Sequence, residues 1–226
     1  MTEHYYESRE DASLAAAKRI AELLSTRLAN NDEASLVVSG GTSPRDCLTA
    51  LAGTTLDWDR VQVAMSDERW VPPEHDDSNE RLVRETLLVN EASAAELLSV
   101  YAADVTPEER CDQLQDPLPV LPFACSLIGM GTDGHFASLF PDADNLDFAM
   151  DVECGRLYVP VDTAASPHRR ISMTLAGISR SDEVALLFFG EDKLDVYRKA
   201  KASSNGEPVS RLLRQKRAPV RIFWAP

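Results

Sequence analysis

Residues 125–141 read Cys-Ser-Leu-Ile-Gly-Met-Gly-Thr-Asp-Gly-His-Phe-Ala-Ser-Leu-Phe-Pro, and this stretch decides the fold. The apolar run at its start is typical of a buried parallel strand. Gly129, Gly131 and Gly134 follow, and glycine allows sharp turns and the close approach of a ligand. His135 therefore comes just after a glycine turn at the carboxyl end of a predicted strand, where open α/β sheets bind ligands.

The three glycines spell Gly-x-Gly-x-x-Gly, the fingerprint of dinucleotide binding, but the context of that fingerprint is missing. It needs a full helix after the third glycine and an acidic residue about 20 positions further on. Pro141 would end such a helix early, because proline lacks an N–H and clashes with the preceding turn. Asp151 and Glu153 lie at a plausible distance, but no predicted strand leads into them. The local pattern leaves two interpretations open for His135, a residue that caps or packs within a tight turn and a catalytic histidine.

A second glycine-rich turn, Ser-Gly-Gly-Thr-Ser-Pro at residues 39–44, follows an apolar segment. The pattern predicts a strand, a loop and then a helix with proline at its first position. Loop N–H groups and a helix start together favour anions, and Thr42 and Ser43 add hydroxyl donors. The turn is not a Walker A loop, because the Gly-Lys-Ser/Thr ending is absent. A helix N-cap with a flexible turn is the alternative interpretation.

The composition excludes several classes of protein. The 226 residues carry 23 Lys and Arg against 37 Asp and Glu, which gives a formal charge of −14. This balance argues against nucleic-acid binding and means that local positive groups must attract an anionic substrate. The four widely spaced cysteines fit reduced thiols. Because no signal peptide and no apolar run of about 18 residues is present, we expect a cytoplasmic protein without membrane contact.

Strands alternate with helices along the chain, which indicates a parallel-sheet α/β fold. We expect a single domain over residues 1–226. The predicted strands cover residues 3–7, 36–38, 61–65, 97–101, 125–128, 157–161, 182–189 and 220–224. The predicted helices cover residues 8–28, 44–52, 78–89, 107–115, 191–202 and 208–215. The proline-rich connection at 116–122 is expected to be a rigid loop, and residues 203–206 a turn.

The central stretch from Gly129 to Pro141 resembles the signature of 6-phosphogluconolactonases. The related glucosamine-6-phosphate deaminases share its first half but usually continue with an Asn-Glu-Pro-containing ending. Further segments resemble lactonase motifs, namely residues 39–44, Asp-Glu-Arg-Trp-Val-Pro at 67–72, Asp-Ser-Asn at 77–79 and Pro-His-Arg-Arg-Ile-Ser-Met-Thr at 167–174. The resemblance is strong over residues 36–175 and weak after Gly190.

The resemblance implies a Rossmann-like parallel sheet flanked by helices, of the glucosamine-6-phosphate deaminase and ribose-5-phosphate isomerase type. It also implies hydrolysis of 6-phospho-D-glucono-1,5-lactone to 6-phospho-D-gluconate, the second step of the oxidative pentose phosphate pathway. The expected partner is this phosphorylated sugar lactone, and the expected state is a monomer or weak homo-oligomer. A deaminase or isomerase acting on glucosamine 6-phosphate and a non-catalytic sugar-phosphate sensor are the alternatives.

Ester hydrolysis needs a base that activates water and donors for the oxyanion that develops. His135 is the candidate base, because imidazole can accept a proton near neutral pH. By the resemblance, Asp67 lies at the reacting end, where it would orient His135 or the substrate. Arg69 faces the substrate by the same resemblance. Arg69 or the main-chain N–H groups from Gly131 to Gly134 could serve the oxyanion.

The resemblance also implies a phosphate site. Its predicted residues are Gly40, Gly41, Thr42 and Ser43, and further substrate contacts are expected from Gly131, Asp133 and Gly134. Arg170 aligns with the arginine of the family, but Arg169 is equally basic, so which of the two points inward stays open. The role of Lys193 also stays open. No metal or other cofactor is expected, because the histidines are scattered, and His75 and His168 are assigned to the surface.

Overall fold

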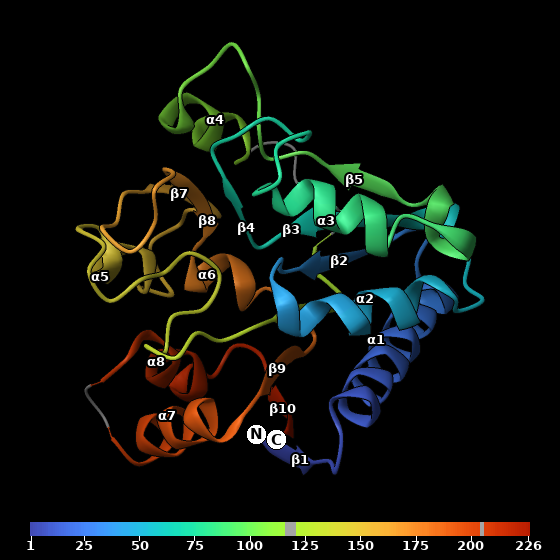
Figure 1. The fold of residues 1–226 in the computed structure, drawn as a ribbon. Helices are drawn as coiled ribbons and strands as arrows, with labels where there is room; N and C mark the ends of the chain where they lie inside the picture. Colours follow the sequence, from blue (N-terminus) through green and yellow to red (C-terminus); the bar gives the residue numbers. More distant parts are fainter. Residues whose placement is uncertain (116–120, 204–205) are drawn as a thin grey trace.

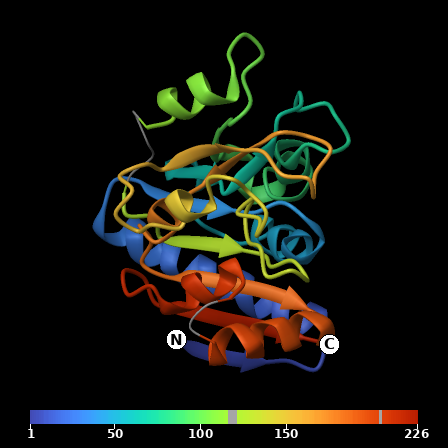
Figure 2. The same ribbon diagram turned by 90° about the vertical axis from the view of Figure 1, so that its left-hand side faces the viewer.

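The computed structural model describes residues 1–115, 121–203 and 206–226. Its centre is a seven-stranded sheet in the order β1-β10-β9-β6-β2-β3-β5, with all neighbouring strands parallel. The strands are β1 (Thr2–Tyr5), β2 (Ala34–Val38), β3 (Val61–Met65), β5 (Glu96–Leu98), β6 (Cys125–Ile128), β9 (Val184–Phe189) and β10 (Val220–Ala225). Figure 2 shows the stacked strands running the same way. The predicted parallel sheet is confirmed.

Helices cover both faces of this sheet (Figure 1). One face carries α1 (Arg9–Asn30), α2 (Thr42–Ala52) and α3 (Asn79–Thr86), and the other carries α7 (Glu191–Ala202) and α8 (Pro208–Arg214). The shorter helices are η1 (Trp58–Arg60), η2 (Asn90–Ala94), α4 (Pro107–Gln113), α5 (Leu146–Ala149) and α6 (Leu175–Ile178). Every residue of β2, β6 and β9 is buried, as expected for strands covered on both faces. Within the described ranges, no helix is both long and apolar enough to cross a membrane.

A smaller antiparallel sheet stands beside the central one, and the sequence did not predict it. Its strands are β4 (Asp67–Arg69), β8 (Arg170–Met173) and β7 (Tyr158–Val161), in that order. The register of β4 and β8 sets Arg69 opposite Arg170 and Asp67 opposite Ser172. The pairing thus joins two segments about 100 positions apart in sequence, each of which carries a candidate site residue.

Most predicted elements lie where the periodicity placed them. Helix α2 begins at Thr42, earlier than predicted, because Gly41 (φ 94°) takes a left-handed conformation that ends the loop. Leu14 was expected on the inner face of α1 but is 50% exposed, since the buried stripe of that helix runs through Ala16, Ile20 and Leu24. Residues 116–120 of the predicted rigid loop and 204–205 of the predicted turn lie outside the described residues.

Glu183, next to the start of β9, anchors α1 and β10 to one another. Its buried carboxylate accepts hydrogen bonds from Arg19 Nε and Nη2 at 3.0 and 3.1 Å. It also accepts them from Arg221 Nε and Nη2 at 2.8 and 3.1 Å. Burial alone would raise the pKa of Glu183, but the two guanidinium groups outweigh it and lower that pKa below 4.5.

Replacing Glu183 with glutamine should lower the free energy of unfolding by about 2–3 kcal/mol at neutral pH, because two half-buried guanidinium groups lose their charge partner. The stabilisation is fully present above the unfolded-state pKa and is lost as pH falls through the lowered folded-state pKa. Urea unfolding at neutral and acid pH measures both effects. Glu22→Gln, which removes an exposed partner of Arg19, is the control. Equal losses in the two variants would contradict this account.

Candidate active site

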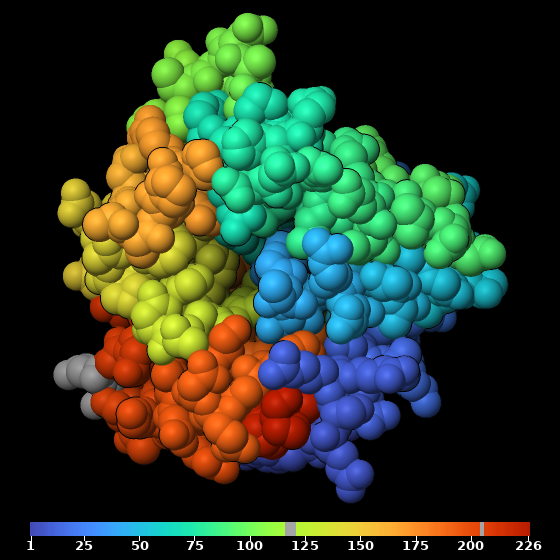
Figure 3. Space-filling model, in the orientation of Figure 1, coloured from blue at the N-terminus to red at the C-terminus, as the bar shows by residue number. Residues whose placement is uncertain are grey.

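A cavity of about 360 Å³ opens at the carboxyl ends of β2 and β6. From β2 the chain adds β3 and β5 on one side, and β6, β9 and β10 follow on the other, so the strand order reverses here. Such switch points are where open α/β sheets bind ligands. In Figure 3 the surface is hollowed where the light-blue start of α2, the teal segment around β4 and the yellow-green segment after β6 meet.

The cavity brings together residues that five parts of the sequence contribute. Its lining includes the predicted Gly40, Gly41, Thr42, Ser43, Asp67, Arg69, Gly131, His135 and Arg170, together with Asn79 and Lys193. Asp133, Gly134 and Arg169, which were also expected to touch substrate, are not among the lining residues. The histidine and the glycine-rich loop after β2 therefore face the same space.

The loop after β2 leads into α2 with its amides uncapped. The N-cap residue, Gly41, has no side chain that could cap the helix, so the first N–H groups of this 11-residue helix keep their donor capacity. Gly40 lies so close to Asn79 that a Cβ there would overlap the side-chain amide of Asn79. That amide donates to Asp67 O at 2.9 Å and accepts from Arg69 Nη1 at 2.9 Å. Asn79 thus joins the loop after β2 to β4. Its motif, Asp-Ser-Asn at 77–79, was found in the sequence, but no role was predicted for this residue.

Replacing Gly40 with alanine should lower kcat/KM about 10-fold, because the new methyl group must displace Asn79 and with it the side chain of Arg69. Steady-state kinetics and a thermal melt measure the effect on activity and on folding. Gly53→Ala is the matched control, since the nearest atom to a Cβ at Gly53 is at 3.7 Å. Unchanged kinetics in a folded Gly40→Ala variant would show that the contact with Asn79 does not matter.

Glu68 fixes the segment between β4 and α3. Its buried carboxylate accepts the backbone N–H groups of Arg69, Asn79 and Glu80 at 2.7, 2.8 and 2.7 Å. Burial raises the pKa of Glu68 to about 7, although these three backbone donors favour the charged form. The Glu68 side chain does not line the cavity, but it fixes the backbone of Arg69 and Asn79, which do.

His135 is oriented by Asp133. The Nδ1 atom of His135 lies 2.5 Å from Asp133 Oδ1, which also accepts the His135 backbone N–H at 3.1 Å. Gly131 permits this turn, because a Cβ there would overlap the imidazole ring. The ring also packs on Phe140, with centroids 4.3 Å apart. A proton on Nδ1 that faces the carboxylate leaves Nε2 as the free base, so the pair has the geometry of a general base with its orienting carboxylate.

Asp67, which was expected to orient either His135 or the substrate, is hydrogen-bonded to serine side chains. Its carboxylate accepts hydrogen bonds from Ser138 Oγ at 2.7 Å and Ser66 Oγ at 2.9 Å, and it lies 3.8 Å from Arg170 Nη1. Asp133, expected only as a substrate contact, takes the position beside the imidazole. The sequence did contain a signal for this contact. An aspartate that is separated from a histidine by one glycine can fold back onto the imidazole ring.

Some of the main-chain N–H groups that were predicted to bind the oxyanion already make hydrogen bonds within the turn. Gly131 N donates to His135 O at 2.9 Å, and Gly134 N donates to Gly131 O at 3.1 Å. These two amides close the turn itself. Arg69 is the other predicted donor, and it lines the cavity.

The structure distinguishes the two neighbouring arginines. Arg170 points into the cavity, where its side chain is 12% exposed, its Nε donates to Ser166 Oγ at 2.9 Å, and burial lowers its pKa. Arg169 points away. Its guanidinium binds Asp162 at 2.8 Å and Glu108 at 2.6 Å, and these two carboxylates raise its pKa. Arg170 is therefore the arginine available to a ligand.

Lys193 reaches the same cavity from the carboxyl end of β9. It lies in the first turn of α7, which Gly190 (φ 94°) starts directly after β9. Burial lowers the pKa of Lys193, and among the described residues Nζ has no recorded hydrogen bond or ion pair. Three cationic side chains line the cavity, those of Arg69, Arg170 and Lys193. The lining includes one carboxylate, that of Asp67, although the protein as a whole is acidic. This excess of positive charge suits an anionic ligand.

Comparison with known proteins identifies the family of this chain. The sequence model of the family described as glucosamine-6-phosphate isomerases/6-phosphogluconolactonase matches residues 7–224. A curated relative from Pseudomonas aeruginosa, named 6-phosphogluconolactonase, is 38% identical over 97% of this chain and 92% of its own length. A relative of the same name from Caulobacter vibrioides is also 38% identical, over 96% of this chain and 94% of its own length.

Solved structures of similar proteins have the same fold. A 6-phosphogluconolactonase from Shewanella baltica OS155 superposes with a TM-score of 0.92 and 33% identity, covering 100% of this chain and 98% of that chain. A monomeric glucosamine-6-phosphate deaminase gives a TM-score of 0.73 at 18% identity over 98% of this chain and 97% of that chain, and shares the fold alone. The predicted deaminase-type fold is confirmed, and the likeness extends beyond Gly190 to nearly the whole chain.

Proposed function

Because this chain belongs to the glucosamine-6-phosphate isomerase/6-phosphogluconolactonase family, we propose that it hydrolyses 6-phospho-D-glucono-1,5-lactone to 6-phospho-D-gluconate. Its curated relatives carry the name of that activity. The observation that carries the proposal is a single cavity that contains a histidine paired with a carboxylate and, beside it, a cluster of cations and uncapped amides. Such a cavity can hold a phosphate and a reacting ester at the same time. The reaction is the second step of the oxidative pentose phosphate pathway.

The phosphate binds, in this proposal, at the loop after β2. The amides of Gly41 to Ser43 and the hydroxyl groups of Thr42 and Ser43 supply donors at the start of α2. Arg170 and Lys193 supply the two charges. Within the described part of the chain, the carboxylate that pairs with Arg170 lies 3.8 Å away, and Lys193 has no ion pair. Asp67, at 3.8 Å from Arg170, holds that guanidinium in place without a direct hydrogen bond.

The lactone ring then lies with its carbonyl carbon near His135. Nε2 of His135 takes a proton from a water molecule, and the resulting hydroxide attacks the carbonyl carbon C1. The tetrahedral intermediate collapses by breaking the bond from C1 to the ring oxygen, and the imidazolium returns its proton to that oxygen. Asp133 stabilises the imidazolium between these two steps. Arg69, or a main-chain N–H group of the turn from Gly131 to Gly134, donates to the oxyanion.

Two assays separate the proposed activity from its alternatives. Acid release from freshly prepared 6-phosphogluconolactone, followed in a pH-stat, should exceed the spontaneous rate in proportion to enzyme concentration. Ammonia release from glucosamine 6-phosphate should stay at background. The reverse pattern would favour a deaminase, and saturable binding of 6-phosphogluconate without turnover of either substrate would favour a sugar-phosphate sensor.

A further inference from the structure

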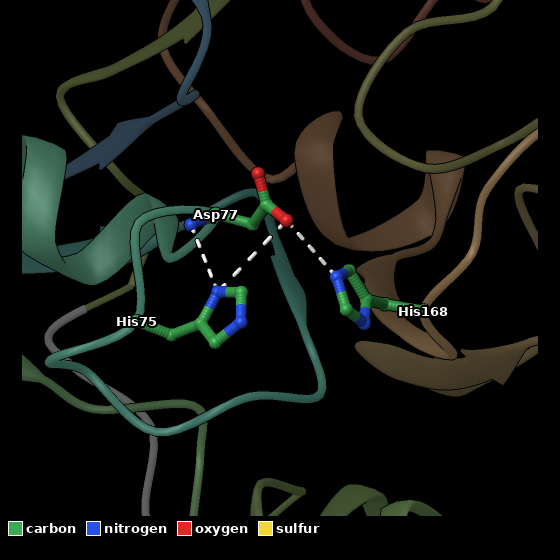
Figure 4. Close-up of side chains that lie close together, drawn as sticks. All are labelled: His75, Asp77 and His168. Atoms are coloured by element: carbon green, nitrogen blue, oxygen red, sulfur yellow. Dashed lines mark hydrogen bonds and ion pairs between the residues drawn. The ribbon is translucent and has the colours of Figure 1, made fainter.

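Two histidines and an aspartate from separate segments meet beside the cavity (Figure 4). His75 and Asp77 lie between β4 and α3, and His168 lies two residues before β8. None of the three is among the described residues that line the cavity. We propose that His75, Asp77 and His168 bind a divalent transition-metal ion such as Zn²⁺, at a site separate from the proposed catalytic one.

The distances suit a metal ion. Asp77 Oδ2 lies 3.0 Å from His168 Nε2 and 3.9 Å from His75 Nδ1, and all three ligand atoms lie within 4.8 Å of one another. A tetrahedral ion with bonds of about 2.0–2.1 Å holds its ligands about 3.3 Å apart. Figure 4 shows the Asp77 carboxylate between the two rings, so small side-chain rotations bring the three atoms to that spacing.

The Nδ1 atom of His75 already acts as an acceptor, as a metal ligand must. It accepts the backbone N–H of Asp77 at 3.0 Å. Metal binding would exchange this hydrogen bond for a bond to the ion. The two imidazole rings are nearly perpendicular, at 79°, so their lone pairs approach the space between them from different directions.

The donor set selects the class of ion. Imidazole nitrogens suit Zn²⁺, Co²⁺, Ni²⁺ and Cu²⁺, whereas Mg²⁺ and Ca²⁺ prefer sites made of oxygen atoms. Three protein ligands leave one position for water, as in many three-ligand zinc sites. The side chains of His75 and Asp77 are 43% and 57% exposed, so an ion can reach the site from solvent.

The surrounding charges do not oppose a cation. Arg169, next to His168, is held by Asp162 and Glu108. Arg81 is likewise paired, with Asp76 and Glu85. The nearest cation of the cavity, Arg69, directs Nη1 to the backbone oxygen of Asp77 rather than to its carboxylate. Among the described residues, the Asp77 carboxylate is thus paired with the two imidazoles and not with an arginine.

An ion at this position would tie together the two segments that hold the arginines of the cavity. Asp77 O accepts the hydrogen bond of Arg69 Nη1 at 2.8 Å. On the other side, Ser166 Oγ accepts from Arg170 Nε at 2.9 Å and donates to His168 O at 2.9 Å. The proposed site thus cross-links the mouth of the cavity from outside. The sequence could not reveal it, because Asp77 and His168 are 91 positions apart.

Isothermal titration of ZnCl₂ into the metal-free full chain tests the proposal. We expect one Zn²⁺ per chain, with affinity reduced at least about 10-fold in His75→Ala and in His168→Ala, since each loses one of three ligands. His135→Ala is the control, because it removes an imidazole from the cavity and leaves the proposed ligands in place. Binding that is lost in His135→Ala but retained in His168→Ala would place zinc in the cavity and overturn the proposal.

A crystal structure tests the proposal without any variant. A crystal of the wild-type protein grown with ZnCl₂ should show an anomalous zinc peak within bonding distance of His75, Asp77 and His168. A thermal melt should show that Zn²⁺ raises Tm in the wild type and not in His168→Ala. No anomalous peak between the two imidazoles at saturating zinc would overturn the proposal, whatever the calorimetry shows.

Discussion

Replacing His135 with alanine should lower kcat by about 10²- to 10⁴-fold, as expected when a general base is lost. The reason lies in the placement of the ring. Asp133 holds Nδ1, Phe140 supports one face, and Nε2 is left to take the proton of the attacking water. A pH-stat assay at saturating lactone, corrected for spontaneous hydrolysis, measures the loss. The KM of the variant should change little, because the phosphate donors lie elsewhere in the cavity.

The control for this variant is His4→Gln, which removes an imidazole from β1 at the far edge of the sheet. A circular-dichroism melt shows whether each variant folds. Wild-type turnover in a folded His135→Ala protein would remove the proposed base. Asp133→Asn should also lower kcat, since the amide no longer stabilises the imidazolium that forms in the reaction.

Replacing Arg170 with alanine should raise KM about 10- to 100-fold, because a charge-assisted hydrogen bond contributes about 1.5–3 kcal/mol. The guanidinium is held in the cavity by Ser166 and Ser138, and its ion pair with Asp67 is long, at 3.8 Å. Steady-state kinetics over a range of lactone concentrations separate KM from kcat. The effect should fall on KM, since the phosphate is bound equally in the ground and transition states.

Arg169→Ala is a matched control, because it removes the same side chain one residue earlier. Arg169 already binds Asp162 and Glu108 at the surface, so we expect its loss to leave KM within about 2-fold of wild type. If the two variants raised KM equally, the assignment of the phosphate contact to Arg170 would be wrong.

The sequence predicted the sheet and its ligand-binding edge because these depend on local patterns. The apolar run of β6, the glycine turn that follows it, and the loop that starts α2 each have short-range signatures, and all were found in place. The resemblance implied that His135 and Ser43 share a site, and both residues line one cavity at the edge where the parallel strands end.

Contacts that depend on tertiary pairing could not be predicted in this way. The three residues of β4 are too few to show a period of two, so its pairing with β8 was invisible. Arg170 begins β8 and Arg169 comes directly before it. The two side chains point to different sides, but the sequence could not say which of them points inward. Asp67 was expected to orient either His135 or the substrate, and the geometry places Asp133 rather than Asp67 beside the imidazole.

The central claim is that the phosphate lies at the start of α2 and the lactone carbon lies beside His135. A crystal structure of the protein with bound 6-phosphogluconate tests this most directly. We predict phosphate oxygens within hydrogen-bond distance of Ser43, Arg170 and Lys193, and the C1 carboxylate within about 3.5 Å of His135 Nε2. A product bound the other way round, with its phosphate at His135, would contradict the account.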